Sequence, residues 1–456
     1  MHIDQNLLMR QHKKDLKFFI GKSLSFDCIE NIARQTGFTQ RTGKVPAEAF
    51  VNALMIPEHT LADTSLPDIA AVLRLGHSVE VSKEALHQKF NKRSVALLEG
   101  LLTNILSEQL KNTRSENLIT HFGSIKIKDS TKFSLPDHYD HHYKGFTNFS
   151  KTNGLLCLQY EYDLISGDWI NIKITPGLRN DQRDALDTID DITPGDLYIR
   201  DLGYATSAYL EAVVNKKAFF LNRLPAMAGV FTSDGKPLSW GKLHSKIKKA
   251  KSAVMDIETV IYEKNKIPAR LIIEPVDNQE YKRRLEKAKN TAKSKNIGIS
   301  KEHKLKLRYN LFITNAPAVQ LAAKSIRKVY YLRWQIELVF KTWKSFFRIN
   351  QVKKVKRERL ETQLLARLLW ILINWQIFKT LNQHVKKLNN NHGISLIIFF
   401  KRCMKFASTL RLVLLRKFSI YKWLTQIYLP LIKDCLCDAP KNKDTHYQTL
   451  NFNYVP

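Results

Sequence analysis

The chain has 456 residues, 44% of them hydrophobic, which is enough to build about two to four domains with buried cores. Its 73 Lys and Arg residues outnumber 42 Asp and Glu residues, and the net charge of +31 predicts a polyanionic partner, with nucleic acid as the leading candidate. Charge alone does not separate DNA-acting proteins from those that coat RNA or anionic membranes. The five cysteines include no Cys-x-x-Cys pair, which argues against a disulfide framework or zinc ribbon and favours a reducing cytoplasm.

Neither a secretory signal nor a membrane span is expected. Residues 1–14 are polar and charged where a signal peptide would be apolar. The most apolar long stretch, residues 364–378, is too short to span a bilayer and contains Arg367 and Asn374. It therefore predicts a buried helix.

Residues 1–118 predict a helical N-terminal DNA-binding region, because apolar residues recur at helical spacing, as in residues 66–73. Ser82 precedes a basic helical stretch, much as the second helix of a helix-turn-helix begins. An ordinary capped helix has the same pattern, so both interpretations stay open.

From Ser124 the pattern changes to short apolar or alternating runs, which predict strands. Helical segments at residues 181–189 and 205–214 separate the later runs. This order predicts a mixed sheet with helices packed on it. The expected strands are residues 125–128, 155–162, 169–174, 197–199 and 218–221.

Two carboxylates, Asp129 and Asp201, stand where predicted strands end. Ligands of such sheets bind beyond the strand ends. Taken alone, either aspartate is better explained as a turn or helix-cap residue, and only together with Glu337 do they form an ordered Asp, Asp, Glu series.

A third carboxylate, Glu337, lies in a helical stretch with Tyr330, Arg333 and Lys344, at offsets of 0, 3, 7 and 14 from Tyr330. At about 100° per residue these positions share one helical stripe. The alternative is a surface helix with Arg333–Glu337 and Glu337–Lys341 pairs. Three carboxylates gathered in a partly dry cleft require a cation to stay ionised, and Mg²⁺ or Mn²⁺ suits oxygen ligands. Two such ions about 4 Å apart would support phosphoryl transfer.

These residues resemble the DDE transposases of bacterial insertion sequences, specifically the insertion-sequence-four family with its Tyr-x2-Arg-x3-Glu-x6-Lys signature. Asp129 is followed by Ser-Thr, Asp201 begins Asp-Leu-Gly-Tyr, and residues 175–181 read Thr-Pro-Gly-Leu-Arg-Asn-Asp, which are also similar to the family. The resemblance covers roughly residues 120–350.

The resemblance implies an α/β fold: a ribonuclease-H-like mixed sheet with a β-rich insertion, flanked by helical N- and C-terminal regions. Within the insertion the sequence predicts strands at residues 256–262, 269–275 and 308–314 and a basic helix at 281–295. The expected regions are a catalytic core at 119–223 and 316–358, the insertion at 224–315, C-terminal helices at 359–437 and a tail at 438–456.

By the same resemblance, Asp129, Asp201 and Glu337 would bind two Mg²⁺ ions, for which Mn²⁺ can substitute. The partners implied are double-stranded DNA, both inverted-repeat ends and target, and a second copy of the chain in a homodimer on DNA. The expected place is the bacterial cytoplasm, at the nucleoid. The residues expected to contact DNA are Tyr330, Arg333, Lys341, Lys344 and Trp240.

Trp240 has two explanations. Some relatives stack an insertion-domain Trp on a base flipped from a DNA hairpin, and Trp240 is the only Trp between Asp201 and the Glu337 helix. A Trp packed in a core explains the residue equally well. Residues 137–142 contain several histidines and aspartates, which are possible zinc ligands. Adjacent His residues lack the spacing of a zinc site, so a polar loop is favoured.

The function expected is cut-and-paste DNA transposition, with metal-dependent cleavage and strand transfer at the ends of the protein's own element. One alternative is a catalytically inactive DNA-binding protein derived from a transposase. Another is a ribonuclease-H-like nuclease acting on branched DNA, against which the spacing of the signature argues. Basic runs at residues 242–251, 282–306 and 353–359 predict a surface that follows DNA.

Overall fold

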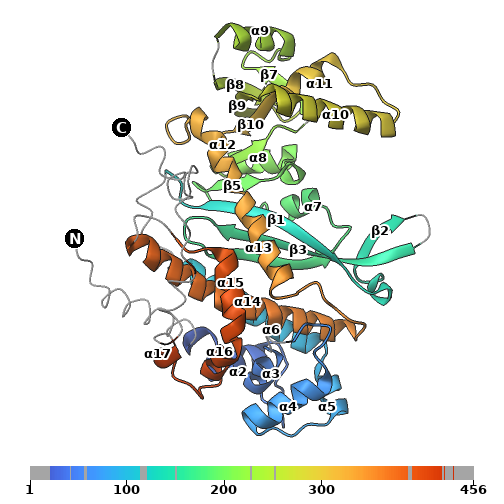
Figure 1. Ribbon diagram of the computed structural model, residues 1–456, viewed down its shortest axis with the longest axis vertical. Coiled ribbons are helices and arrows are strands. Elements are labelled where there is room, and N and C mark those ends of the chain that lie inside the picture. Colours follow the sequence, from blue (N-terminus) through green and yellow to red (C-terminus); the bar gives the residue numbers. More distant parts are fainter. Residues whose placement is uncertain are drawn as a thin grey trace.

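The computed structural model places the chain in three tiers, with terminal helices below, a sheet in the middle and further strands and helices above (Figure 1). Residues 1–20, for which no signal was expected, and the expected tail at 438–456 lie outside the described residues. The structure describes residues 21–41, 43–55, 59–112, 121–148, 151–225, 228–250, 253–388 and 393–423, together with 426 and 435.

The N-terminal region is helical, as predicted. Ser65 begins α4 with a reciprocal capping box, in which its hydroxyl accepts from the Asp68 amide while the Asp68 carboxylate accepts from Ser65. Ser82 accepts from the Ala85 amide and so begins the predicted short basic helix. The helices are α2 (Phe26–Gln35), α3 (Ala47–Leu54), α4 (Leu66–His77), α5 (Lys83–Lys89) and α6 (Lys92–Asn112).

One ten-stranded sheet runs through the middle and upper tiers, in the order β2-β3-β1-β5-β6-β10-β9-β8-β7, with β4 also paired to β3. All strands predicted from the sequence are present. They are β1 (Ile125–Ser134), β2 (Lys144–Asn148), β3 (Lys151–Asp163), β4 (Trp169–Pro176), β5 (Leu197–Arg200), β6 (Phe219–Arg223), β7 (Val230–Thr232), β8 (Met255–Ile261), β9 (Ile267–Pro275) and β10 (Tyr309–Thr314).

The expected insertion continues the sheet of the core. Strands β4, β3 and β1 are antiparallel neighbours, and β5 and β6 then run parallel to β1. This is the arrangement expected of a ribonuclease-H-like core. Strand β10 pairs antiparallel with β6, so β10, β9, β8 and β7 extend the same sheet upward.

Helices cover both faces of the sheet. Hydrophobic residues of α6, α13 and α14 share one core with β1 and β3, whereas those of α7 and α8 share a second core with the insertion strands. The predicted α/β class with helical flanks is confirmed. The helices are α7 (Asp181–Asp187), α8 (Ser207–Asn215), α9 (Trp240–Ala250), α10 (Asn278–Ser294), α11 (Lys301–Lys306), α12 (Ala323–Tyr331), α13 (Trp334–Ser345), α14 (Arg357–Leu388), α15 (Leu396–Cys403), α16 (Ala407–Leu414) and α17 (Ile420–Trp423).

The predicted buried helix is present and longer than expected, because α14 extends over 32 residues. Its segment Arg357–Gln383 is long and apolar enough to cross a membrane, which corrects the expectation that the stretch is too short. However, 83% of its most apolar window is buried inside the protein. A core helix of a folded domain has this property, and α14 packs along α6 below the sheet (Figure 1).

Alternation along two parallel strands places the two aspartates on one face. In β1, Ile125 and Ile127 enter the core shared with α13, and in β5, Leu197 and Ile199 do the same. Because side chains alternate, the next residue of that parity in β1 is Asp129, and beyond the end of β5 it is Asp201.

The opposite face of the same strands carries buried charges. Arg200 donates to Glu161 at 3.0 Å, and Lys128 pairs with Asp184 of α7. All four side chains are at most 4% exposed. Burial acts to raise the pKa of Glu161, but Arg200 and Lys128 outweigh it and hold that pKa below its ordinary value. The pairs thus lie directly behind the two aspartates.

Replacing Glu161 by alanine is expected to lower the free energy of unfolding by about 3–5 kcal/mol, because Arg200 and Lys128 would retain buried positive charge. Urea denaturation followed by tryptophan fluorescence measures the change. The control Asp234→Ala breaks the exposed Asp234–Lys236 pair and is expected to leave the midpoint unchanged. An unchanged midpoint for Glu161→Ala would contradict a structural role for the buried pairs.

Candidate active site

Asp129 and Asp201 lie on adjacent parallel strands at the same level. The register pairs Ile127 with Ile199 and Lys128 with Arg200, so the next position brings Asp129 beside Asp201. Asp129 is still within β1, and Asp201 begins the short turn Leu202–Tyr204. Both aspartates therefore stand on backbone that the sheet fixes.

The third carboxylate comes from α13, which crosses β1 on the same face (Figure 1). Ile336, Val339, Phe340 and Trp343 form the buried side of this helix. The Trp343 ring lies 4.9 Å from that of Tyr160 in β3 and 5.2 Å from that of Trp169 in β4, measured between ring centroids.

The predicted single helix through residues 330–344 is divided in two. Helix α12 ends at Tyr331 and α13 begins at Trp334. At the junction the Leu332 amide donates to the Val329 carbonyl and the Arg333 amide to the Tyr330 carbonyl, both at 3.1 Å. This three-residue spacing tightens the turn, so the stripe expected on one regular helix is shared between two helices.

Arg333 joins two of the three carboxylates. Its Nη1 donates to Oδ2 of Asp129, and its Nη2 donates to Oε1 of Glu337, both at 2.8 Å. The Arg333 side chain is 16% exposed, that of Asp129 20% and that of Glu337 34%. The predicted Arg333–Glu337 pair is present, and its guanidinium also reaches across to the sheet.

Burial raises the pKa of Asp129 to about 6, although Arg333 and the Ser130 amide act to lower it. The neighbouring carboxylates of Asp201 and Asp181 raise it further. Two opposing effects therefore determine the pKa of Asp129. Burial disfavours the charged carboxylate, and the Arg333 guanidinium favours it.

Tyr330 contacts the remaining carboxylate. Its hydroxyl donates to Oδ1 of Asp201 at 3.3 Å. Burial, and then the charge of Asp201, raise the pKa of Tyr330 above its ordinary value, so the phenol keeps its proton. The tightened turn between α12 and α13 directs Tyr330 to Asp201 and Arg333 to Asp129.

Two lysines of α13 have different surroundings. Lys344 donates from Nζ to the Lys132 carbonyl of β1 at 2.9 Å, and burial lowers its pKa. Lys341 is exposed on the side of the helix. Together with Arg333, Lys344 fixes α13 to β1 near both ends of the helix.

The structure does not bring Trp240 to this site. Trp240 begins α9 at the top of the molecule, where its side chain is 6% exposed and the Lys306 ammonium lies 4.7 Å from its ring centroid. It belongs to the core of the insertion strands, as the alternative interpretation holds. Burial of this kind leaves no ring face open for a DNA base.

The histidine-rich residues 137–142 form a short turn. His138 contacts the Val355 carbonyl through Nε2 at 3.0 Å, and His141 is exposed. Among the residues that the structure describes, no three His, Cys, Asp or Glu side chains converge closely enough to enclose a metal ion. The same holds for Asp129, Asp201 and Glu337 in their present positions.

The donor set nevertheless fits a hard divalent cation. Three carboxylates face one region, and the guanidinium of Arg333 supplies the positive charge between Asp129 and Glu337. A divalent cation bound there would supply the positive charge that the Arg333 guanidinium now supplies to Asp129 and Glu337. Asp129, Asp201 and Glu337 are the residues suited to hold it.

Sequence reasoning missed a fourth carboxylate, Asp181. Its Oδ1 accepts from the Ser130 hydroxyl at 3.1 Å and from Nε2 of Gln159 at 3.2 Å. The segment that carries it, residues 175–181, was noted only as part of the family pattern. The local sequence around Asp181 indicates only the start of a helix, because Asp181 directly follows the helix cap Asn180.

A mixed sheet with carboxylates at its strand ends and cations beside them is typical of proteins that transfer phosphoryl groups on nucleic acid. Residues 120–373 match the family described as Transposase DDE domain, which is more than half of the chain. The chain therefore belongs to the DDE transposases, and the family resemblance expected from the sequence is confirmed at this level.

Curated relatives are transposases of insertion sequences. The transposase of element IS231E from Bacillus thuringiensis subsp. finitimus is 30% identical, over 76% of this chain and 76% of its own length. That of IS231F from Bacillus thuringiensis subsp. israelensis is 29% identical, over 81% and 80% respectively. That of IS1151 from Clostridium perfringens is 28% identical, over 82% of each chain.

Among solved structures, the piggyBac transposase synaptic complex with hairpin DNA is similar over 97% of this chain and 87% of that chain, with 10% identity and a TM-score of 0.43. The family and the curated relatives identify the function as DNA transposition. This family uses a divalent metal and acts on DNA.

The raised pKa of Asp129 predicts how stability depends on pH. Its ordinary value is 3.8, and in the folded, metal-free protein it is about 6. Between these values the folded state holds a proton that the unfolded state has lost, so raising the pH costs stability. We expect the free energy of unfolding, relative to that of Asp129→Asn, to fall from about pH 4 to about pH 6.5 in EDTA.

Urea titrations of both proteins at each pH give this difference. Asp190→Asn, which alters a fully exposed side chain, is the control and is expected to follow the natural protein throughout. A difference between the natural protein and Asp129→Asn that stays constant with pH would contradict the raised pKa.

Proposed function

We propose that this transposase cuts DNA at the ends of its own insertion sequence and joins the freed ends to target DNA, using Mg²⁺, with Mn²⁺ as a substitute. Asp129, Asp201 and Glu337 hold the metal. The observation that carries this proposal is the pair of hydrogen bonds from Arg333 to Asp129 and Glu337, which gathers carboxylates from distant parts of the chain.

The three carboxylates have distinct supports in this proposal. Asp129 and Asp201 stand at the ends of adjacent sheet strands, and Glu337 stands on a helix fixed to β1, so the backbone that carries them is positioned before DNA arrives. When bound, divalent ions activate an attacking oxygen and stabilise the leaving oxygen of an in-line displacement. The buried charge pairs behind the sheet limit movement of the two strand ends.

Arg333 changes partners during this process. It neutralises Asp129 and Glu337 in the metal-free site. With a divalent ion held by the carboxylates, its planar guanidinium would be free to bind a DNA phosphate with two hydrogen bonds. Tyr330 and Lys344 position the strand beside the cut, and the exposed Lys341 adds a phosphate contact.

Exposed aromatic side chains flank this region. Tyr331 is 58% exposed and Trp334 is 56% exposed, one on each side of the junction between α12 and α13. Each is adjacent in sequence to Tyr330 or Arg333. Rings in this position can stack on a DNA base, the role that the buried Trp240 is not placed to fill.

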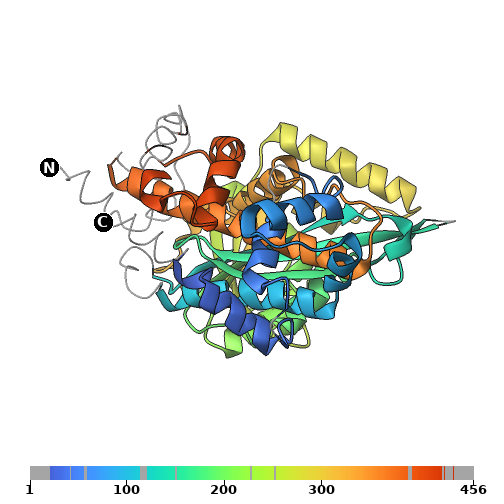
Figure 2. The same cartoon turned by 90° about the horizontal axis from the view of Figure 1, so that it is seen from below.

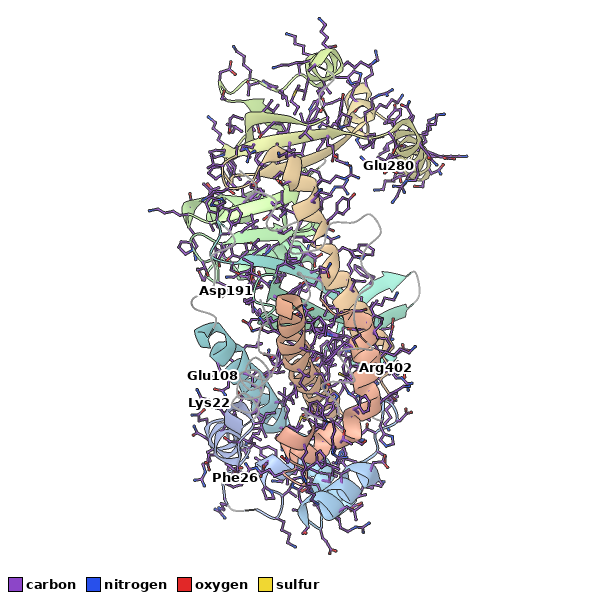
Figure 3. All side chains as sticks on the ribbon, turned by 60° about the vertical axis from the view of Figure 1, so that its left-hand side comes forward. Lys22, Phe26, Glu108, Asp191, Glu280 and Arg402 are labelled. Carbon is purple, nitrogen blue, oxygen red and sulfur yellow. The ribbon has the colours of Figure 1, made fainter. Side chains whose placement is uncertain are left out.

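The insertion extends the DNA-binding surface through α10, a basic helix that stands out from the sheet (Figure 2). Glu280, near its start, binds Arg283 and Arg284, and Arg284 also donates to the Tyr309 carbonyl of β10 at 2.9 Å. Side chains project outward around this helix, where Glu280 is labelled (Figure 3). We assign the exposed lysines of this helix to phosphate contacts, and a homodimer to the DNA-bound form.

The test of the proposed function is cleavage of a labelled duplex that spans the flank of the gene, with Mg²⁺ or with EDTA. We expect metal-dependent cutting at the flank boundary by the natural protein and none by Asp129→Asn, Asp201→Asn or Glu337→Gln. DNA binding by these variants is expected to persist, because the basic surface is unchanged. Lys344→Ala is expected to weaken binding to the end.

The matched control is Glu258→Gln, which makes the same chemical change at an exposed residue of β8 and is expected to cut normally. Full activity in any of the three carboxylate variants would remove the proposed metal site. Binding without cutting by the natural protein as well would favour the alternative of an inactive DNA-binding protein.

The role of α10 predicts a change in salt dependence. Lys289 and Lys293 are exposed and lie one helical turn apart. Replacing both by alanine is expected to reduce the slope of log K against log salt by about 1–2, since each lost phosphate contact contributes about 0.9. Fluorescence anisotropy of labelled DNA at increasing salt measures the slope.

The control replaces Lys217 and Lys264, which are exposed outside α10, by alanine. It removes the same charge and is expected to leave the slope nearly unchanged. Equal slopes for both double variants would show that the helix has no special contact with DNA.

A further inference from the structure

Asp181 occupies a place among elements that are far apart in sequence. It is the first residue of α7, yet its Oδ1 accepts hydrogen bonds from Ser130 of β1 and Gln159 of β3. Ser130 directly follows Asp129, and its own amide donates to Asp129 Oδ1 at 2.8 Å. One residue of β1 thus connects the two carboxylates.

The donors to Asp181 are themselves fixed. The Gln159 side chain is almost wholly buried, and its Oε1 accepts from the Tyr204 hydroxyl at 2.7 Å. Since that bond occupies the carbonyl side of the amide, Nε2 of Gln159 is directed at Asp181. Tyr204 lies in the turn that Asp201 begins, so the chain of bonds runs from the β5 end back to β1.

The second oxygen of Asp181 meets that same turn. A Cβ added at Gly203 would lie 2.9 Å from Oδ2 of Asp181, closer than such atoms approach. Glycine at this position therefore allows the carboxylate to approach the backbone two residues after Asp201. Asp181 is in contact with the supports of both aspartates.

We propose that Asp181 is a positioning residue of the active site, whose carboxylate ties the end of β1 that carries Asp129 to the turn that carries Asp201. This inference rests on the proposed function. It assigns to Asp181 the role of an acceptor for Ser130 and Gln159, and it assigns the metal to the three carboxylates named above.

A simple helix-start role explains these contacts less well. An aspartate in the first turn stabilises a helix through its dipole, and for that it needs no partner on another element. The cap of α7 is already provided by Asn180, which accepts from the Arg183 amide at 2.9 Å. The bonds of Asp181 reach instead to two strands of the sheet.

The experiment measures Mn²⁺ binding to the full chain by electron paramagnetic resonance of free Mn²⁺, together with cleavage of the flank duplex over a range of Mn²⁺ concentrations. The variants are Asp181→Ala, Asp181→Asn, Ser130→Ala and, as the control, Asp190→Asn. Asparagine keeps an oxygen that accepts from Ser130 and Gln159, whereas alanine removes it.

We expect Asp181→Ala to weaken Mn²⁺ binding by about tenfold or more, as loss of an outer support of a metal ligand does. The Mn²⁺ concentration needed for cleavage should rise in parallel, while the dissociation constant for DNA stays the same. Asp181→Asn should restore Mn²⁺ binding to within about threefold of the natural protein, and Asp190→Asn should match it.

Natural Mn²⁺ affinity in Asp181→Ala would overturn the inference. Equal losses in Asp181→Asn and Asp181→Ala would also overturn it, because the charge itself would then matter rather than the hydrogen bonds. A lower melting temperature of Asp181→Ala in EDTA would mean that loss of stability could explain its weaker Mn²⁺ binding. In that case Ser130→Ala is the deciding variant, because it removes one hydrogen bond to Asp181 and keeps the Ser130 amide that donates to Asp129. Weakened Mn²⁺ binding in Ser130→Ala supports the inference, and natural affinity overturns it.

Asp201→Asn separates failure of this inference from failure of the proposed function. If the natural protein binds Mn²⁺ no better than Asp201→Asn, the metal site itself is absent and both proposals fail. If Asp201→Asn loses Mn²⁺ while Asp181→Ala does not, only the positioning role fails.

Discussion

The guanidinium of Arg333 is the interaction on which the site depends. Asp129 and Glu337 come from a strand and a helix more than 200 residues apart, and their negative charges would separate them without a cation between. Arg333 is tied to both because the turn between α12 and α13 tightens just before it. In the proposed function a metal ion would replace the charge of Arg333 at this pair, and Arg333 would then bind a DNA phosphate.

Alternation along the sheet explains how one pair of strands serves both stability and chemistry. The residues before the aspartates, Lys128 and Arg200, enter the opposite face and are neutralised there by Asp184 and Glu161. The strand ends are therefore held from behind by buried pairs that are costly to break, and in front by a pair that is easily exchanged.

The sequence was sufficient for features set by local pattern. Strand periodicity located β1 and β5, and the spacing of Tyr330, Arg333, Glu337 and Lys344 pointed to the DDE transposases, to which the family match assigns the chain. The sequence pattern did not determine three features that depend on contacts between elements distant in the chain. The break after Tyr331 follows from hydrogen bonds at the junction, the burial of Trp240 follows from packing of the insertion, and Asp181 acquires its importance only when α7 docks on the sheet.

The most direct test of the proposed metal site is anomalous X-ray scattering from crystals of the natural protein grown with Mn²⁺ and a duplex of its own element end. We expect Mn²⁺ peaks among the carboxylates of Asp129, Asp201 and Glu337, with Arg333 turned to a DNA phosphate. Mn²⁺ bound elsewhere, or Arg333 still joined to Asp129 and Glu337 in the DNA complex with no metal beside them, would contradict the proposed metal site.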